Sequence, residues 1–289
     1  GQTADDPYAL SMAPARFTFL GTGTSAGIPM IGCRCAVCTS DDPRDRRLRV
    51  SALVEWTDPK GLARAVLIDA GPDLRQQVLS HNDGEGLHRL DAILFTHNHV
   101  DHTFGLDEVR RFNAVMRQPI DVYANAHTLD HLRRVYAHIF DTDQNVQPSF
   151  VANLNPHELT PGEPIELWGM RFTPLLLLHG RLPILGFRIE PASDTMRVPW
   201  APLAYCTDTS EIPAETWPML EGLKTLVLDA LRPRPHNTHF TLQQAIDAAQ
   251  RIDPGRTWFI HMSHDLPHAE TDAALPDRIA LAHDGLTLA

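Results

Sequence analysis

Side chains that commonly bind metal ions stand close together in residues 96–102, with the sequence Thr-His-Asn-His-Val-Asp-His. Alternate residues of an extended backbone face the same way, so His97 and His99 can bind one ion. Asp101 and His102, beyond a bend, can be directed at a second ion beside it. Neutral imidazole together with carboxylate suits zinc, manganese or iron. The segment therefore predicts a site for two neighbouring metal ions.

A second group of candidate ligands consists of three cysteines, Cys33, Cys35 and Cys38, within six positions. Thiols this close cannot pair with one another without strain, whereas a tetrahedral zinc ion accepts all three and needs one further ligand. The fourth cysteine, Cys206, lies in a strand-like segment. We therefore expect the remaining ligand to come from a distant part of the chain.

Apolar, strand-like segments precede most of the candidate site residues. The run 92–95 ends just before His97, and apolar residues recur at helical spacing from Phe104, so we expect a helix to start near Thr103. Further candidates follow other apolar runs: Asp69, His179, Asp208 and His261. Such strand ends are where an α/β protein builds its site, and the pattern by itself predicts an α/β fold.

The remaining segments are assigned by their periodicity and their turn residues. We expect a strand at 16–20, a hairpin of strands at 51–55 and 65–68, and strands at 120–123, 171–178, 185–189, 203–205, 226–228 and 258–260. Helices are expected at 74–79, 129–140 and 241–251, and residues 141–164 are expected to be rich in loops. We expect a flexible N-terminal tail over residues 1–14 and a single domain over residues 15–289.

Composition limits the classes of function. The 289 residues are 43% hydrophobic and 21% charged, and the formal net charge is −11. This charge argues against a protein that coats extended nucleic acid, but a site can still bind a small anionic substrate. No apolar run is long enough to cross a membrane, and residues 1–14 show no secretory signal. Clustered cysteines suited to metal predict a reducing compartment, the cytoplasm.

Two segments allow two interpretations each. The glycine-rich turn at residues 21–27 either approaches an anion closely or is a plain tight turn. The run that contains Arg44, Arg46, Arg47 and Arg49 is either a solvated loop or a source of arginines that bind an anionic group of the substrate. The sequence does not decide between these alternatives.

The pattern T-H-x-H-x-D-H in residues 96–102 resembles the signature of the metallo-β-lactamase superfamily. The resemblance is closest to its PhnP-like phosphodiesterase branch. It rests on Gly-Thr-Gly-Thr-Ser at 21–25, on C-x-C-x-x-C at 33–38, on Asp-Pro-Arg-Asp-Arg-Arg at 42–47, and on His261 and His264. It covers residues 17–264 and implies an αββα sandwich of two mixed β-sheets flanked by helices.

The resemblance also implies a set of site residues. One ion would be held by His97, His99 and His179, the other by Asp101, His102 and His261, with Asp208 bridging the two. Asp69 would orient a metal-bound histidine. A structural zinc would be held by Cys33, Cys35, Cys38 and His264. We count Asp101, Asp208 and His239 as catalytic, with His239 as the general acid and His236 as its alternative, because imidazole titrates near neutral pH.

The function implied is that of a metal-dependent hydrolase with two zinc or manganese ions, a phosphodiesterase for small phosphate esters, cyclic ones included. A hydroxide that bridges the ions would be the nucleophile, and the site would carry a net charge of about +1, which favours an anionic substrate. Alternatives are hydrolysis of a thioester, lactone or β-lactam, and a PqqB-like role in cofactor biosynthesis. A non-catalytic metal-dependent binding module and an iron-dependent redox role are further alternatives. Whether the chain forms a homodimer stays open.

Overall fold

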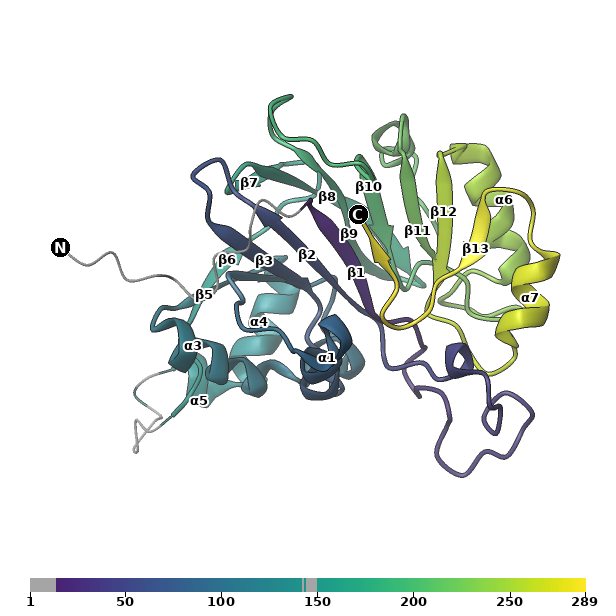
Figure 1. Ribbon diagram of the computed structural model, residues 1–289, viewed down its shortest axis with the longest axis horizontal. Coiled ribbons are helices and arrows are strands. Elements are labelled where there is room, and N and C mark those ends of the chain that lie inside the picture. Colours follow the sequence, from purple (N-terminus) through teal and green to yellow (C-terminus); the bar gives the residue numbers. More distant parts are fainter. Residues whose placement is uncertain (1–13, 142, 144–149) are drawn as a thin grey trace.

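Two β-sheets pack face to face in the computed structural model, which describes residues 14–141, 143 and 150–289 (Figure 1). Each sheet has seven strands in the described part of the chain. The tail that we expect over residues 1–14 lies outside the described residues, except for Pro14.

The first sheet contains the strands of the first half of the chain, β1 to β6, and the last strand, β14. Its order is β14-β1-β2-β3-β4-β5-β6, antiparallel from β14 to β3 and parallel from β3 to β6. Its strands are β1 (Arg16–Gly21), β2 (Ser51–Thr57), β3 (Ala63–Ile68), β4 (Ala92–Leu94), β5 (Ile120–Ala124), β6 (Leu154–Glu158) and β14 (Thr287–Leu288).

The second sheet is built from the second half of the chain. Its order is β13-β12-β11-β10-β9-β8-β7, parallel from β13 to β10 and antiparallel from β10 to β7. Its strands are β7 (Ile165–Leu167), β8 (Met170–His179), β9 (Leu182–Pro191), β10 (Leu203–Cys206), β11 (Thr225–Asp229), β12 (Arg256–Ile260) and β13 (Ile279–Leu281). Both sheets are therefore mixed, as the resemblance implies.

Helices lie outside both sheets. α1, α3, α4 and α5 lie beside the first sheet, and α6 and α7 beside the second (Figure 1). The helices are α1 (Leu74–Ser80), α2 (Val100–Thr103), α3 (Arg110–Met116), α4 (Ala126–Val135), α5 (Ala137–Phe140), α6 (Leu242–Ile252) and α7 (His268–Ala274). The start of α6 follows from its sequence, because the side chains of Thr241 and Gln244 form a reciprocal capping box.

Three apolar clusters stabilise these layers. The largest lies between the sheets and includes Phe17 and Phe19 of β1 as well as Phe172 and Phe187 of the second sheet. The second joins the first sheet to its helices, and the third joins the second sheet to α6. Alternation along β1 directs both phenylalanines inward, and burial of such side chains drives the stacking of the sheets. The predicted αββα sandwich is confirmed.

Two local predictions were wrong. The helix expected near Thr103 begins at Val100, because His99 takes the extended backbone of an N-cap within the metal motif. The helix expected over 129–140 is interrupted at Tyr136, which separates α4 from α5. The segment 141–164, expected to be rich in loops, also contains β6, an edge strand that is largely exposed and so shows no apolar alternation.

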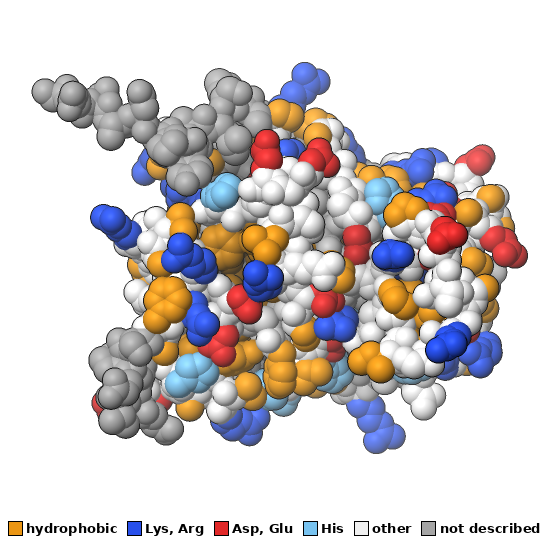
Figure 2. Space-filling model, turned by 60° about the horizontal axis from the view of Figure 1, so that its bottom comes forward, with side chains coloured by type: hydrophobic (Ala, Val, Ile, Leu, Met, Phe, Trp, Pro, Cys, Tyr) orange, Lys and Arg blue, Asp and Glu red, His pale blue; other side chains and the backbone are white. Residues whose placement is uncertain are grey.

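The surface mixes both signs of charge. Basic and acidic side chains are interspersed over the face in Figure 2. No helix in the described part of the chain has the length and apolar character needed to cross a membrane.

Candidate active site

The candidate ligands of the two ions converge at one edge of the sandwich. β4, β8, β10 and β12 end there, and the short helix α2 begins there. His99 is exposed and the other members are buried, so the cluster opens to solvent on the side of His99. The members are His97, His99 and His179 in one group and Asp101, His102, Asp208 and His261 in the other.

The first group consists of imidazoles. His97 Nε2 lies 3.0 Å from His99 Nδ1, and the rings of His99 and His179 have centroids 5.0 Å apart. His179 donates its Nδ1 hydrogen to the carbonyl oxygen of Thr238 at 2.8 Å. That bond leaves Nε2 of His179 as the nitrogen that can bind an ion.

The second group combines carboxylates with imidazoles. His102 Nε2 lies 3.3 Å from Asp101 Oδ2 and 3.2 Å from Asp208 Oδ1. His261 Nε2 lies 3.2 Å from Asp208 Oδ2. The same Oδ2 atom is 3.8 Å from His97 Nε2 in the first group. Asp208 therefore stands between the two groups, where a bridging carboxylate must be.

These distances fit metal coordination. Oxygen and nitrogen ligands at neighbouring corners of a zinc tetrahedron lie about 3.4 Å apart. The contacts of 3.2 and 3.3 Å in the second group agree with that separation. In addition, His102 Nε2 and His261 Nε2 are buried without a hydrogen-bond partner. Buried nitrogens of this kind are costly unless an ion accepts their lone pairs.

Asp69 orients histidines of both groups. Its Oδ2 atom accepts the Nδ1 hydrogen of His102 at 2.7 Å and the hydroxyl hydrogen of Thr96 at 2.7 Å. The Thr96 hydroxyl in turn accepts from Nδ1 of His97 at 2.9 Å. One buried carboxylate therefore fixes the ring orientation of His102 directly and of His97 through a threonine that the sequence analysis gave no role.

The backbone at the strand ends is itself shaped for the site. Asp69, Asp208 and His261 have φ angles of 63°, 51° and 59°. Residues with side chains rarely adopt this left-handed conformation, and where they do, the strain is typical of functional sites. Asp69 and His261 directly follow β3 and β12, and Asp208 comes two residues after the end of β10, so the unusual φ bends the chain where each strand has just ended.

The electrostatic environment of the ligand cluster favours a bound cation. Burial alone would lower the pKa of His102, but neighbouring carboxylates, Asp208 and Asp101 foremost, raise that pKa well above its ordinary value. Burial would raise the pKa of Asp208, but His102 and His261 hold it well below its ordinary value. Burial lowers the pKa of His97, which favours the neutral form that binds metal. Ionised aspartates beside imidazoles, whose raised or lowered pKa values follow these carboxylates and burial, are the ligand chemistry of divalent ions.

His239 lies at the edge of the cluster and is held by a residue to which the sequence analysis gave no role. Its Nδ1 atom is 2.6 Å from Asp229 Oδ2 at the end of β11. Its ring lies 4.7 Å from that of His179 and 4.4 Å, in a stacked arrangement, from that of His261. The alternative acid, His236, is exposed and its Nδ1 contacts its own loop through Thr238. The structure thus favours His239 over His236 as the residue that faces the cluster.

Sequence reasoning had one signal that could have found Asp229. Like Asp69 and Asp208, it is an acidic residue at the end of an apolar strand. Its side chain is fully buried, and its Oδ1 atom has no hydrogen-bond partner and lies 3.9 Å from His261 Nδ1. Burial raises the pKa of Asp229 well above its ordinary value.

The three clustered cysteines meet His264. Its Nδ1 atom lies 3.3 Å from Cys33 Sγ, 3.4 Å from Cys35 Sγ and 3.7 Å from Cys38 Sγ. Sulfur and nitrogen ligands of one tetrahedral zinc lie about 3.6 Å apart. The backbone amide of Cys38 lowers the pKa of Cys35 to about 7, whereas burial raises the pKa of Cys38 to about 11. The four residues thus form a separate group that could hold an ion.

Three of the four arginines in the run bind other parts of the protein. Arg47 is fully buried, and its guanidinium donates to the carbonyl oxygens of Ser263 and Leu266 at 2.8 and 2.6 Å. Arg44 pairs with Asp42 at 2.7 Å, and Arg49 pairs with Asp73 at 2.8 Å. Arg46 is exposed.

The solvated-loop interpretation is wrong for Arg47, whose partners lie more than two hundred positions along the chain. The glycine turn belongs to the same packing. A Cβ atom on Gly23 would come within 2.7 Å of the Arg47 carbonyl oxygen, so the close approach there is to the protein's own backbone.

Comparison with known proteins gives matches along most of the chain. A family model described as the beta-lactamase superfamily domain matches residues 64–262. A crystal structure of a diphosphatase from the PhnP family superposes with a TM-score of 0.81 and 42% sequence identity, covering 95% of this chain and 96% of that one. Zinc-bound PqqB from Methylobacterium extorquens superposes with a TM-score of 0.73 over 95% of this chain and 99% of that one, but at 22% identity this shows the fold alone.

A curated relative adds a different name. The octanoyltransferase of Porphyromonas gingivalis (strain W83) is 37% identical over 273 residues, which are 94% of this chain and 51% of that protein. The chain thus spans about half the length of this relative. Together the matches show that the chain belongs to the metallo-β-lactamase superfamily and to its PhnP-like branch.

Proposed function

We propose that this member of the PhnP-like branch of the metallo-β-lactamase superfamily is a phosphodiesterase with two metal ions, acting on small phosphate esters that include cyclic ones. The observation that carries the proposal is Asp208, which lies 3.2 Å from His102 and from His261 in one ligand group and 3.8 Å from His97 in the other. Two adjacent groups that share a carboxylate are the arrangement that dinuclear hydrolysis requires.

The residues that would hold the ions are those of the two groups. His97, His99 and His179 would hold one, Asp101, His102 and His261 the other, and Asp208 would contact both. Zinc or manganese, when bound there, would make water a nucleophile at neutral pH and neutralise charge on the phosphoryl oxygens. Asp69 and Thr96 keep the imidazole rings aimed at the site before any ion arrives.

His239 is proposed to protonate the leaving alcohol. Asp229 accepts the hydrogen on Nδ1, so Nε2 is the atom that can exchange a proton with the substrate. Burial lowers the pKa of His239 below its ordinary value, and nearby Asp208 only partly opposes that shift. An imidazole beside the ligand groups has the position that a general acid needs.

The cysteine group would hold a structural zinc. Cys33, Cys35 and Cys38 lie in the loop between β1 and β2, and His264 lies in the segment after β12 that also contains His261. A zinc ion there would fasten that loop beside the active site, and buried Arg47 makes a second connection to the same segment. Four thiols without a disulfide fit a reducing compartment such as the cytoplasm.

The alternative functions are less well supported. Thioester hydrolysis would use the same ligand groups but releases a thiolate, which needs no acid dyad. Lactone and β-lactam hydrolysis would use both the ligand groups and the dyad, so turnover measurements decide between these reactions and phosphodiester hydrolysis. The chain matches only about half of the protein named octanoyltransferase. The acyl transfer that this name describes can therefore belong to the other half of that protein. A PqqB-like role rests on relatives at 24% identity, such as coenzyme PQQ synthesis protein B of Methylorubrum extorquens (strain PA1).

The test measures metal content and turnover in the same preparations. The wild type is compared with Asp208→Ala and His239→Ala on bis(p-nitrophenyl) phosphate and on a panel of cyclic phosphates. We expect about three metal ions per chain and loss of turnover in Asp208→Ala. In His239→Ala we expect full metal content, slower turnover of the cyclic phosphates, whose alkoxide leaving group needs a proton, and little change for bis(p-nitrophenyl) phosphate.

Two results would contradict the proposal. Full metal occupancy without phosphodiester turnover would redirect the assignment to thioesters and lactones. Loss of an ion in His239→Ala would make His239 a ligand, which its proximity to His179 and Asp208 also permits.

A further inference from the structure

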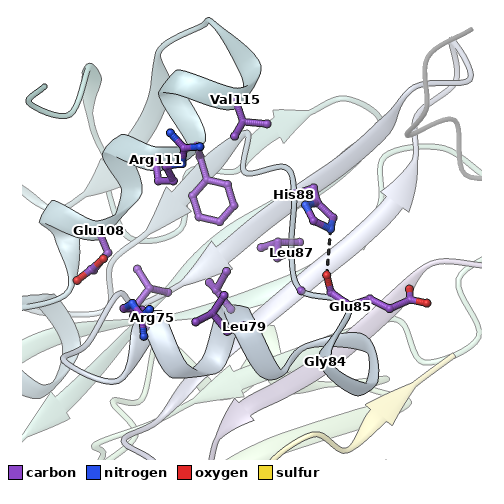
Figure 3. A pocket seen from close by; sticks show the side chains of 13 residues that line it. Arg75, Leu79, Gly84, Glu85, Leu87, His88, Glu108, Arg111 and Val115 are labelled. Carbon is purple, nitrogen blue, oxygen red and sulfur yellow. Dashed lines mark hydrogen bonds between the residues drawn. The ribbon is translucent and has the colours of Figure 1, made fainter.

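A cavity of about 440 Å³ lies apart from the metal cluster, between α1, α3 and the loop that follows α1 (Figure 3). Its lining contains none of the candidate ligands or the residues that orient them. A volume of this size is in the range of small-molecule sites, roughly 300–1,000 Å³. Nothing in the proposed hydrolysis uses it.

The long walls of the cavity are apolar. α1 contributes Leu74, Val78 and Leu79, and α3 contributes Phe112 and Val115. Leu74 and Phe112 are buried, whereas Leu79 and Val115 are 53% and 44% exposed. Large apolar side chains left open to water in a concave site gain free energy when an apolar ligand covers them.

One end of the cavity carries a net positive charge. Arg75, Glu108 and Arg111 lie together at that end (Figure 3). Arg75 and Arg111 are the second residues of α1 and α3, and both are exposed. Within the described part of the chain, neither guanidinium makes a hydrogen bond or an ion pair. Two arginines and one carboxylate, that of Glu108, give this end of the cavity a net charge of about +1.

The opposite end offers little attraction for a charged group. Glu85 lies there, and its carboxylate points away from the other lining side chains (Figure 3). His88 Nε2 contacts the backbone oxygen of Glu85 at 3.0 Å. The cavity is therefore an apolar slot with a cationic end.

We propose that this cavity binds an amphiphilic carboxylate, an anionic head group on an unbranched aliphatic chain. The carboxylate would lie between Arg75 and Arg111, whose planar donor groups match its two oxygens. The aliphatic chain would lie along Leu79, Phe112 and Val115, and a length of roughly eight to twelve carbon atoms matches the volume. The site is independent of the metal cluster and of the reaction assigned to it.

The test is a calorimetric titration of the full-length protein with decanoate, kept below its micellar concentration. We expect saturable binding of one decanoate per chain, and weaker binding of decyltrimethylammonium, which has the same chain with the opposite charge. Replacing both arginines, Arg75→Gln with Arg111→Gln, should weaken decanoate binding about tenfold or more, because two charge-assisted hydrogen bonds are lost. The matched control is Arg110→Gln, whose guanidinium lies over Phe150 instead.

A second variant tests the apolar walls. Val115→Trp should fill the slot and abolish binding, and Leu79→Gln serves the same purpose if the larger side chain prevents folding. Equal binding of decanoate and decyltrimethylammonium would overturn the proposal. Decanoate binding that is unchanged in the double arginine variant and in the variant of the apolar wall would also overturn it. A third result would also overturn it: the protein self-associates, Val115→Trp abolishes this association, and decanoate does not compete with it. The occupant of the cavity would then be a second copy of the chain.

Discussion

Asp229 and His239 form a buried dyad with a separation of 2.6 Å between Oδ2 and Nδ1, at the edge of the two ligand groups. The carboxylate lies at the end of β11, and the histidine lies ten positions further, just before α6. A carboxylate that holds one nitrogen of an imidazole fixes which tautomer is present and how the ring is turned. The dyad thus separates the proton chemistry of the site from its metal chemistry.

Replacing the carboxylate should slow the reaction in a way that depends on the leaving group. In Asp229→Asn, the oxygen that accepts the Nδ1 hydrogen and fixes the tautomer and ring orientation of His239 is lost, so we expect kcat to fall at least tenfold for alkyl phosphodiesters. For p-nitrophenyl esters, the fall in kcat should be small, because p-nitrophenolate leaves without first taking up a proton. The measurement is kcat across a series of leaving alcohols, with metal content determined in parallel.

Asp247→Asn, on the exposed side of α6, is the control for this series. A loss of the same size for every leaving group would show that Asp229 acts on the metal ligands instead. Its Oδ1 atom lies 3.9 Å from Nδ1 of His261, so this outcome has a structural basis.

Local patterns in the sequence predicted the parts of this architecture that are local in the chain. The motif at residues 96–102 and the cysteine run at 33–38 are each read from a few neighbouring residues. By contrast, the position of Asp229 at a strand end marks it as a candidate, but its pairing with His239 could not be predicted, because only the folded sheet brings the strand end and the loop together. Buried Arg47 was hidden for the same reason, since Ser263 and Leu266 supply its acceptors from the far end of the chain.

The edge strand β6 shows a different limit. Its residues are almost all exposed, so no apolar alternation marks it, and it forms only because the parallel edge of β5 offers backbone partners. Hydrogen bonding to a neighbouring strand leaves no trace in the sequence pattern. Here tertiary context determines the element.

Removing the carboxylate that orients two histidines should weaken metal binding. In Asp69→Asn, His102 loses the acceptor of its Nδ1 hydrogen, and the link through Thr96 to His97 is broken. We expect the affinity of the dinuclear site for zinc to fall about 10–100-fold. Competition of the metal-free protein with a chromogenic chelator measures this change.

The matched control is Asp73→Asn, a nearby aspartate whose partner is Arg49. An unchanged zinc affinity in Asp69→Asn would mean that the sheet edge alone orients the imidazoles. Loss of the cysteine-bound zinc in that variant would point to a general folding defect.

Breaking the cysteine group should cost one zinc ion and lower stability while leaving the dinuclear ligands in place. Cys35→Ser removes a thiolate 3.4 Å from Nδ1 of His264. We expect the free energy of unfolding to fall by about 2–5 kcal/mol, the range found when a covalent cross-link over a long loop is removed. Elemental analysis and thermal unfolding check the two effects.

Cys206→Ala is the control for the thiol itself. Cys206 is buried in the core and lies outside every candidate ligand group, so the variant should retain all metal. Full zinc content in Cys35→Ser would contradict the structural-zinc proposal.

Asp284 should make the stability of the protein depend on pH near neutrality. Burial raises its pKa to about 7, even though the backbone amide of Leu48 and the hydroxyl of Thr22 each donate to it at 2.7 Å. The native state then binds a proton that the unfolded state has already released, because an unfolded aspartate titrates near pH 4. Stability should therefore be highest below about pH 4 with respect to this group and fall as the pH rises to about 7.

The expected loss is up to about 1.4 kcal/mol for each unit between the two pKa values. Asp284→Asn carries no titrating proton and should flatten this part of the profile, whereas Asp277→Asn, at an exposed position, should leave it unchanged. Denaturant unfolding at a series of pH values from about 4 to 8 measures the slope directly. Stability that rises with pH across this window in the wild type, and equally in Asp284→Asn, would show that the buried carboxylate is ionised throughout and that Leu48 and Thr22 suffice to hold its charge.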